Sequence, residues 1–508
     1  MEKSYVDFMN EISSEDLYDG LLGYGMFAEK LPPVFQSLDF LNYCKLNLPS
    51  YKYKQWTDYV SYNSMRNVNI PRTYGIPVPM TYEVLCSHLR DKWECIRKHF
   101  ESQTDKQEHR VSRIHLRKQY EKSVLFEMNY KNWKVDGTPN IDYLLVGSRD
   151  AVSRYLVKAD ISTCFPSIYT HAISWALVGK SESKKNVGVE TWYNIIDNQC
   201  ASLKNGETHG LLIGPHASNL LAEIILTKVD SELYDLGYRF NRYIDDYECF
   251  VRSYEDALQF ERDLGFALRK YDLSINCKKT QILKLPLIDN NLWVNELTDM
   301  MPNKDSLLSY NETNRYLDKV ISMANEVQNA AVINYAIKCL AGIAMTASAN
   351  TLYLQRISHL VVLCPYLLPL MDDYVFQPRD ATVIQIQAFS EALYEESKSI
   401  NNYEGVSYAI YYALRYNFHL RHLNTEWILA SGDCVLYVIA WLYFLRANHG
   451  NRRATEVKPF VRKARELSEH DFYRYWLFCY EVLDKSTLPE EWKDLKNNGV
   501  SFIKDTYR

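Results

Sequence analysis

The sequence predicts an α+β fold up to about residue 300, followed by an all-helical part. Three observations carry this prediction. A short apolar strand ends in an acid at Asp160, and a later strand reverses at Asp245-Asp246 into its own return strand. Beyond about residue 300, apolar residues recur at helical spacing in one segment after another, with turn residues between the segments. At 508 residues the chain exceeds what one core usually organises, so more than one domain is expected.

The strand that ends at Asp160 covers about 156–161, and the hairpin covers about 238–251 with the two adjacent carboxylates at its tip. Acids at the ends of neighbouring strands can share two divalent cations, which activate an attacking 3′-hydroxyl and neutralise departing pyrophosphate. Oxygen ligands suit Mg²⁺, with Mn²⁺ as a substitute. We predict Asp160 and Asp245 as the main metal ligands. Asp246 shares the site less directly, and Ile161 is included in it. The alternative is that Asp-Asp is only a common turn dipeptide, as we expect for Asp372-Asp373.

Two further segments lie around the hairpin. Residues 209–219 contain Gly214, Ser218 and Asn219 and lead into a helix with an apolar face. The glycine allows close approach of backbone to a base pair, and the Ser-Asn pair can hydrogen-bond a nucleotide. An N-capped core helix is the ordinary alternative. After the hairpin, a helix over about 257–271 precedes Lys279, which could protonate or neutralise pyrophosphate. The alternative for Lys279 is a surface lysine that closes a strand.

These segments resemble reverse transcriptase motifs in their order along the chain. The run 158–169 resembles motif A, 209–219 motif B, the Asp-Asp hairpin motif C and 273–280 motif D. The wording of 147–171 is similar to the abortive-infection (Abi) and related defence-associated reverse transcriptases of bacteria. The resemblance covers about residues 70–286. It implies a right-hand polymerase with the N-terminal part of the fingers over 1–105, a fingers and palm core over 106–300, and a HEAT-like helical domain over 301–508 in the thumb position.

The resemblance also assigns roles to single residues. Phe165 stands at the steric gate that crowds a ribose 2′-hydroxyl, which implies deoxynucleoside triphosphates as substrates; a core Phe beside a short helix is the alternative. Leu212-Ile213 stands where the family commonly has Pro-Gln, so a polar group expected near the nucleotide and template is missing.

Arginine side chains are the predicted phosphate ligands, because a guanidinium fork matches phosphate geometry. Structural salt bridges are the competing explanation. The candidates for the triphosphate are Arg72, Arg149 and Arg154. A second basic face, formed by Arg110, Arg113 and Arg117 at helical spacing, could follow a nucleic-acid backbone, and a solvated helix is the ordinary alternative. A nucleic-acid-binding wall is predicted in the helical part, where a solvated helix is the alternative. Its candidates are Arg452, Arg453, Arg462 and Lys463.

Composition bounds the remaining expectations. A net charge of −5 excludes a generic nucleic-acid coat, so a basic contact surface must be local. Eleven cysteines without a C-x-x-C pair argue against a zinc site and favour reduced thiols. The first residues are too acidic for a secretory leader, and the longest apolar run, 434–445, is too short for a membrane span. We therefore expect a cytoplasmic bacterial protein with no membrane partner.

The functional hypothesis is DNA synthesis from deoxynucleoside triphosphates with two Mg²⁺ ions. By resemblance, it acts in antiphage defence (abortive infection), forms homo-oligomers, and starts DNA on a protein hydroxyl without a template, so that the DNA product stays covalently attached. Which of the forty tyrosines primes is not readable from the sequence. The alternatives are a noncoding-RNA-templated reverse transcriptase, an RNA-directed RNA polymerase or terminal transferase, and a non-catalytic RNA-binding scaffold.

Overall fold

The fold comes from a computed structural model of the 508-residue chain. It describes residues 4–48, 51, 55–66, 70–108, 110–116, 126–128, 134–135, 138–139, 153–287, 292–301, 307–327 and 331–508. Arg117 and Arg149 lie outside these ranges. None of the helices within them is both long and apolar enough to cross a membrane.

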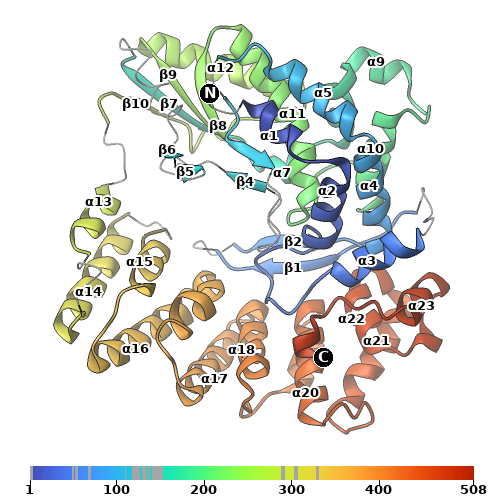
Figure 1. The fold of residues 1–508 in the computed structure, drawn as a ribbon, viewed down its shortest axis with the longest axis vertical. Coiled ribbons are helices and arrows are strands. Elements are labelled where there is room, and N and C mark those ends of the chain that lie inside the picture. Colours follow the sequence, from blue (N-terminus) through green and yellow to red (C-terminus); the bar gives the residue numbers. More distant parts are fainter. Residues whose placement is uncertain are drawn as a thin grey trace.

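A four-stranded antiparallel sheet forms the centre of the N-terminal part (Figure 1). Its strands, in spatial order, are β10 (Gln281–Lys284), β7 (Tyr155–Asp160), β9 (Asp246–Val251) and β8 (Arg239–Tyr243). The predicted strand therefore ends at Asp160, and the predicted hairpin turns at Ile244 and Asp245. Both predictions are confirmed.

Alternation along the strands separates the two faces of this sheet. Tyr247 and Cys249 of β9 point to the back face and are buried. The back face packs against α12 (Tyr254–Arg269), with α11 (His216–Asp235) beside it, and the rings of Phe240 and Phe260 lie 6.2 Å apart there. A capping box between Ser253 and Asp256 fixes the start of α12. The opposite face, which carries Asp160 and Asp246, is left open for the site.

Residues 5–104 and 164–202 surround one end of this sheet. Short helices and a β-hairpin build them, and Tyr82 is buried where they meet. Their elements are α1 (Tyr5–Asn10), α2 (Ser14–Asp19), α3 (Leu38–Asn47), β1 (Val60–Ser64), β2 (Arg72–Ile76), α4 (Pro79–Asp91), α5 (Trp93–Thr104), α7 (Cys164–Ser167), α8 (Thr170–Val178), α9 (Lys180–Lys185) and α10 (Trp192–Ser202).

The predicted basic helix face around Arg110 and Arg113 is wrong. Residues 111–113 run beside β8, where the Arg113 amide donates to the Arg242 carbonyl over 2.9 Å and the Arg242 amide donates to the Val111 carbonyl over 2.9 Å. Both arginines are buried, and the Arg113 guanidinium donates to the Asn241 side chain over 2.6 Å. The edge strand β8 offers unpaired backbone groups, which pull this segment out of any helix.

From residue 292 onward the chain forms helices that follow one another in an arc below the sheet in Figure 1. The packing of α17 on α18, α18 on α20 and α20 on α22 builds this arc. The larger elements are α13 (Leu292–Asp299), α14 (Tyr310–Val327), α15 (Ala331–Ala341), α16 (Ala347–Leu363), α17 (Val383–Ser399), α18 (Tyr403–Tyr416), α19 (Thr425–Ala430), α20 (Cys434–Ala447), α21 (Lys458–His470), α22 (Trp476–Val482) and α23 (Glu490–Asn497).

The Asp372-Asp373 pair in this part is not the simple turn that was expected. It lies in the π-helical segment Met371–Phe376, and the Asp372 carboxylate accepts hydrogen bonds from the hydroxyls of Tyr411 and Tyr416. Asp372 therefore holds two helices together, whereas Asp373 is exposed.

The helical part begins near the central sheet at α13 and returns to the β1–β2 hairpin at its C-terminal end (Figure 1). The Trp476 indole nitrogen donates to the Ile76 carbonyl over 3.3 Å, and Glu404 accepts from the Ser64 hydroxyl over 2.7 Å. Phe35 and Ile503 form a β-bridge between the two ends of the described chain. One continuous buried apolar cluster includes residues of all these parts.

A candidate polymerase active site

Three carboxylates meet at one end of the central sheet. Asp160 and Asp246 are direct partners in the antiparallel register of β7 and β9, so their side chains share the open face. Asp245 is the preceding residue at the hairpin tip, and its carbonyl accepts a hydrogen bond from the Ile161 amide over 3.1 Å. The backbone of the predicted motif A is thus tied to the hairpin. The buried side chain of Ile161 contributes packing to this junction.

The electrostatics of these acids show that negative charge is crowded here. Burial raises the pKa of Asp246 to about 6, and repulsion from Asp245 and Asp160 adds to this shift. Burial also raises the pKa of Asp245, with Asp160 again contributing. Although Asp246 as a residue stays exposed to solvent, its carboxylate faces the other two acids. A nearby cation would favour the ionised forms of all three.

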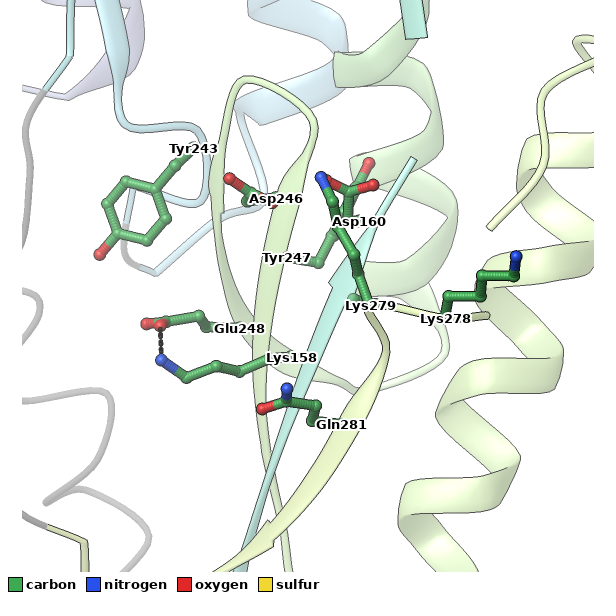
Figure 2. Close-up of a pocket in the computed structure, with 10 residues that line it drawn as sticks. Lys158, Asp160, Tyr243, Asp246, Tyr247, Glu248, Lys278, Lys279 and Gln281 are labelled. Atoms are coloured by element: carbon green, nitrogen blue, oxygen red, sulfur yellow. Dashed lines mark hydrogen bonds and ion pairs between the residues drawn. The ribbon is translucent and has the colours of Figure 1, made fainter. Parts of the chain in front are cut away.

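Two side chains from the loop before β10 contact Asp160. The Lys279 ammonium lies 2.8 Å from one carboxylate oxygen, and the Asn276 amide donates to the other over 3.0 Å. Figure 2 shows Lys279 reaching toward Asp160, whereas its neighbour Lys278 turns away. The Lys279 side chain is 64% exposed and that of Asp160 only 12%, so the lysine can move while the acid stays in place. Lys279 also lowers the pKa of Asp245 and Asp246.

A cavity of about 580 Å³ opens in front of the carboxylates. Its floor is the open face of the sheet, where Lys158 and Glu248 form an ion pair at 3.0 Å in the row next to Asp160 and Asp246. The Tyr243 ring lines the cavity from the far side of the hairpin (Figure 2). The remaining lining includes Lys278 and Gln281. The cavity therefore gives a polar ligand access to the acids.

The acids fit a divalent-metal site in their chemistry. Asp160, Asp245 and Asp246 supply hard oxygen ligands, and their mutual repulsion would be relieved by cations. Among the described residues, no group of three or more His, Cys, Asp or Glu is already arranged as a metal cluster. The ammonium of Lys279 instead supplies positive charge at Asp160.

The structure places the predicted nucleotide-side residues around the start of α11. Phe165 is half-buried in α7, and its carbonyl accepts from the Leu211 amide over 2.9 Å. Gly214 has φ +123°, a conformation that L-residues rarely adopt, and a Cβ there would meet the protein at Ala28 and Tyr74. Ser218 is buried and Asn219 is half-buried on the first turn of α11. The glycine thus serves packing within the protein itself, and its predicted approach to a base pair stays a prediction.

The predicted phosphate arginines separate in the structure. Arg72 is exposed at the start of β2, and its positive charge lowers the pKa of Asp245; its role as a phosphate ligand stays a prediction. Arg154 precedes the first residue of β7, at the opposite end of that strand from Asp160. Six residues of strand span about 20 Å, so the backbone of Arg154 lies far from the carboxylates, and its role as a phosphate ligand stays a prediction.

The predicted nucleic-acid-binding residues lie in α21 and just before it, and two of them form ion pairs with neighbouring acids. Arg452 forms an ion pair with Asp484 at 2.8 Å, and Lys463 forms one with Glu466 at 2.9 Å. Arg453 and Arg462 are exposed. Sequence patterns alone do not separate the two paired cations, Arg452 and Lys463, from the two exposed arginines.

Sequence reasoning missed two residues that position the site. Asn276 was recognised only as part of the motif D wording, yet it holds Asp160 directly. Arg242 lies within the predicted hairpin but is not singled out by the sequence, yet it donates to the carbonyl of Ile244 at the hairpin tip. A charged residue at an inward-facing strand position was the available signal for Arg242.

Lys279→Met should lower the rate of nucleotide incorporation by about 10²–10⁴-fold, the usual contribution of a proton-donating side chain. It should also move the acidic limb of the pH–rate profile to higher pH, because Lys279 lowers the pKa of Asp245 and Asp246 and its loss raises both. The measurement is the incorporation rate between pH 5 and 9.

Lys278→Met is the matched control, since Lys278 lines the same cavity without contacting Asp160 in Figure 2. Lys279→Arg keeps the charge and should keep the position of the acidic limb. If the rate of Lys279→Met were unchanged, Lys279 would have no role in catalysis and would be an ordinary surface lysine.

The family model described as reverse transcriptase (RNA-dependent DNA polymerase) matches residues 106–324, which include the three carboxylates and Lys279. A reverse transcriptase domain is therefore present, and this domain is of the nucleotidyltransferase class, RNA-directed DNA polymerase type. The predicted fold class, a reverse transcriptase-like α+β part followed by a helical part, is confirmed.

No curated protein matches the chain. Among solved structures, the chain is similar to apo telomerase from Candida tropicalis truncated from its C-terminal domain, at 12% identity and a TM-score of 0.31 over 49% of this chain and 55% of that one. It is also similar to telomerase from Candida albicans in complex with a TWJ fragment of telomeric RNA, at 10% identity and a TM-score of 0.31 over 89% and 67% of the two chains. The chain thus spans about half the length of the first of these telomerases.

Proposed function

We propose that this chain is a DNA polymerase that joins deoxynucleoside triphosphates at the site formed by Asp160, Asp245 and Asp246. The observation that carries the proposal is the register that sets Asp160 opposite Asp246, with Asp245 at the adjoining tip. Two Mg²⁺ ions bound there would activate the attacking hydroxyl and neutralise the leaving pyrophosphate. Arg72 would hold phosphate oxygens, and Lys279 would leave Asp160 to serve the departing group.

Phe165 would select deoxynucleotides by filling the space of a ribose 2′-hydroxyl. Phe165→Ala should therefore raise the use of ribonucleotides relative to deoxynucleotides by about 10- to 100-fold, the range over which a change of pocket size alters discrimination. The measurement is the ratio of kcat/KM for a matched pair of nucleotides. Phe165→Tyr keeps the ring and should keep the ratio. An unchanged ratio in the alanine variant would assign Phe165 to core packing alone.

We further propose that synthesis starts on a protein hydroxyl and needs no template, in antiphage defence of the abortive-infection kind. The Abi-like wording of 147–171 supports the role. The surroundings of the buried Leu212 support synthesis without a template. Its side chain packs against Gly75, where an added Cβ would lie 2.8 Å from Leu212 Cδ2. The Gly75 amide also donates to the Ile213 carbonyl over 2.9 Å. Packing of β2 on Leu212-Ile213 would then stand where the resemblance leads us to expect a polar contact to a templating base, and this would weaken rejection of a wrong base.

The test is to incubate nuclease-treated protein with one labelled deoxynucleotide at a time and Mg²⁺, without added nucleic acid. Label that stays on the polypeptide until protease digestion supports priming by the protein, and mass spectrometry then identifies the residue. Label that appears only with an added primer and template, and never on protein, would contradict the proposal. The Asp245→Asn variant in the same assay separates enzymatic labelling from nonspecific binding.

A second candidate is a reverse transcriptase that copies a bound noncoding RNA, and the family match to RNA-dependent DNA polymerases favours it. The exposed Arg453 and Arg462 near the helix α21 would then contact the RNA backbone. Sequencing of copurifying nucleic acid, and loss of labelling after nuclease treatment, would distinguish this candidate. From the resemblance to the Abi enzymes we also propose that the chain forms homo-oligomers and that its helical arc is HEAT-like.

A further inference from the structure

Arg242 is a completely buried arginine directly beneath the catalytic hairpin, with a relative exposure of 0%. Its Nε donates to both carboxylate oxygens of Asp230, at 2.9 and 2.8 Å. Its Nη1 donates to Glu223 over 2.9 Å. Both acids are themselves buried, on the back of helix α11. A guanidinium fully surrounded by acceptors has one fixed position, because each of its donors is committed.

One contact of this guanidinium reaches the hairpin tip. Nη1 also donates over 2.9 Å to the carbonyl of Ile244, the residue immediately before Asp245. Ile244 has φ +58°, a left-handed conformation that is a clear outlier for a β-branched residue. Such a conformation persists only where the surroundings hold it. The Arg242 contact is a hydrogen bond from a charged donor to the strained peptide itself.

Glu223, one of the two acids that hold Arg242, is in turn held from other parts of the chain. Glu223 accepts from the Tyr5 hydroxyl over 2.8 Å and from the Ser112 hydroxyl over 2.6 Å. The turn that presents Asp245 is therefore connected through Arg242 to α11, to the segment beside β8 and to α1. These elements are separated by long stretches of sequence.

We propose that Arg242 is a positioning residue: it holds the Ile244 peptide in its left-handed turn and thereby presents the Asp245 carboxylate to divalent metal. This inference rests on the proposed function, because it assumes that Asp245 binds metal. Arg242 does not bind the metal itself, but it contributes to metal affinity. It does so because its buried charge stabilises the strained conformation of Ile244.

The experiment measures Mn²⁺ binding to the full chain by electron paramagnetic resonance, without nucleotide and independently of polymerisation. Arg242→Lys keeps the positive charge beside Glu223 and Asp230, but one ammonium cannot also reach the Ile244 carbonyl. We expect it to weaken Mn²⁺ binding by about tenfold, the effect of losing one hydrogen bond from a charged donor. Tyr5→Phe is the matched control, since it removes a bond to Glu223 from the same network without touching the turn. It should lower the melting temperature and leave Mn²⁺ affinity unchanged.

A second pair of variants tests the strain directly. Glycine adopts the left-handed conformation without steric cost, so Ile244→Gly removes the need for a clamp. Arg242→Lys should therefore change Mn²⁺ affinity less in the Ile244→Gly background than in the wild type. Equal affinity of wild type and Arg242→Lys, with only a lower melting temperature, would overturn the proposal and leave Arg242 a stabilising residue. If the wild type bound Mn²⁺ but did not polymerise, the proposed function would be contradicted. The Mn²⁺ affinities of wild type and Arg242→Lys would still decide whether Arg242 positions the turn.

Discussion

Asp245→Asn should abolish nucleotide incorporation while the protein remains folded. The substitution keeps the size of the side chain and removes one of three converging negative charges. Loss of a metal-binding carboxylate removes charge stabilisation of several kcal/mol from the transition state, which corresponds to a rate loss of at least about a thousandfold. Asp245 is half-exposed at the hairpin tip, so core packing is not affected. The rate is measured by incorporation of labelled deoxynucleotide, and folding by thermal melting.

The same substitution gives a second readout in the metal-free protein. Repulsion from Asp245 contributes to the raised pKa of Asp246, which is about 6. The pKa of Asp246 should therefore fall in Asp245→Asn, as followed by NMR titration of the carboxyl carbon. Asp373→Asn is the control, because it alters the second Asp-Asp pair at an exposed position far along the chain. Incorporation at the wild-type rate by folded Asp245→Asn would exclude Asp245 as a metal ligand.

The elements of the site were predictable where local sequence determines them. The strand ending at Asp160 and the hairpin at Asp245 follow from alternation and a turn, both of which act over a few residues. Helix α11 followed from its apolar spacing. The approach of Lys279 to Asp160 was not predicted as a contact, although Lys279 itself was assigned to the site, because it depends on how β10 pairs with β7.

The remaining features depend on contacts between distant parts of the chain. Arg242 acquires its role from Glu223 and Asp230, which lie on the preceding helix, and no local pattern joins these residues. Arg113 was read from helical spacing, but the open edge of β8 captured its segment. Arg154 is predicted from its position before motif A, and the direction of β7 shows that its backbone lies at the end of the strand away from Asp160.

The contact between the C-terminal helices and strand β2 is the largest feature that the sequence does not predict. Trp476 of α22 is part of this contact. Its ring is fully buried, lies 4.9 Å from that of Phe502 and 5.6 Å from that of Trp492, and its indole nitrogen bonds to Ile76 of the fingers. Trp476→Ala should lower the free energy of unfolding by about 3–5 kcal/mol, the cost of a large cavity in a packed core.

Chemical denaturation measures this change, and limited proteolysis follows the junction itself. Because Trp476 joins α22 to β2, its loss should expose sites in the C-terminal helices before the central sheet is cut. Trp476→Phe keeps most of the packing and removes the hydrogen bond to Ile76, so it should fall between the alanine variant and the wild type. Trp56→Ala is the matched control, since that ring is 65% exposed and its removal should cost no more than about 0.5 kcal/mol. If Trp476→Ala and Trp56→Ala were equally mild, the fingers and the helical part would be held together elsewhere, at contacts such as Glu404 with Ser64.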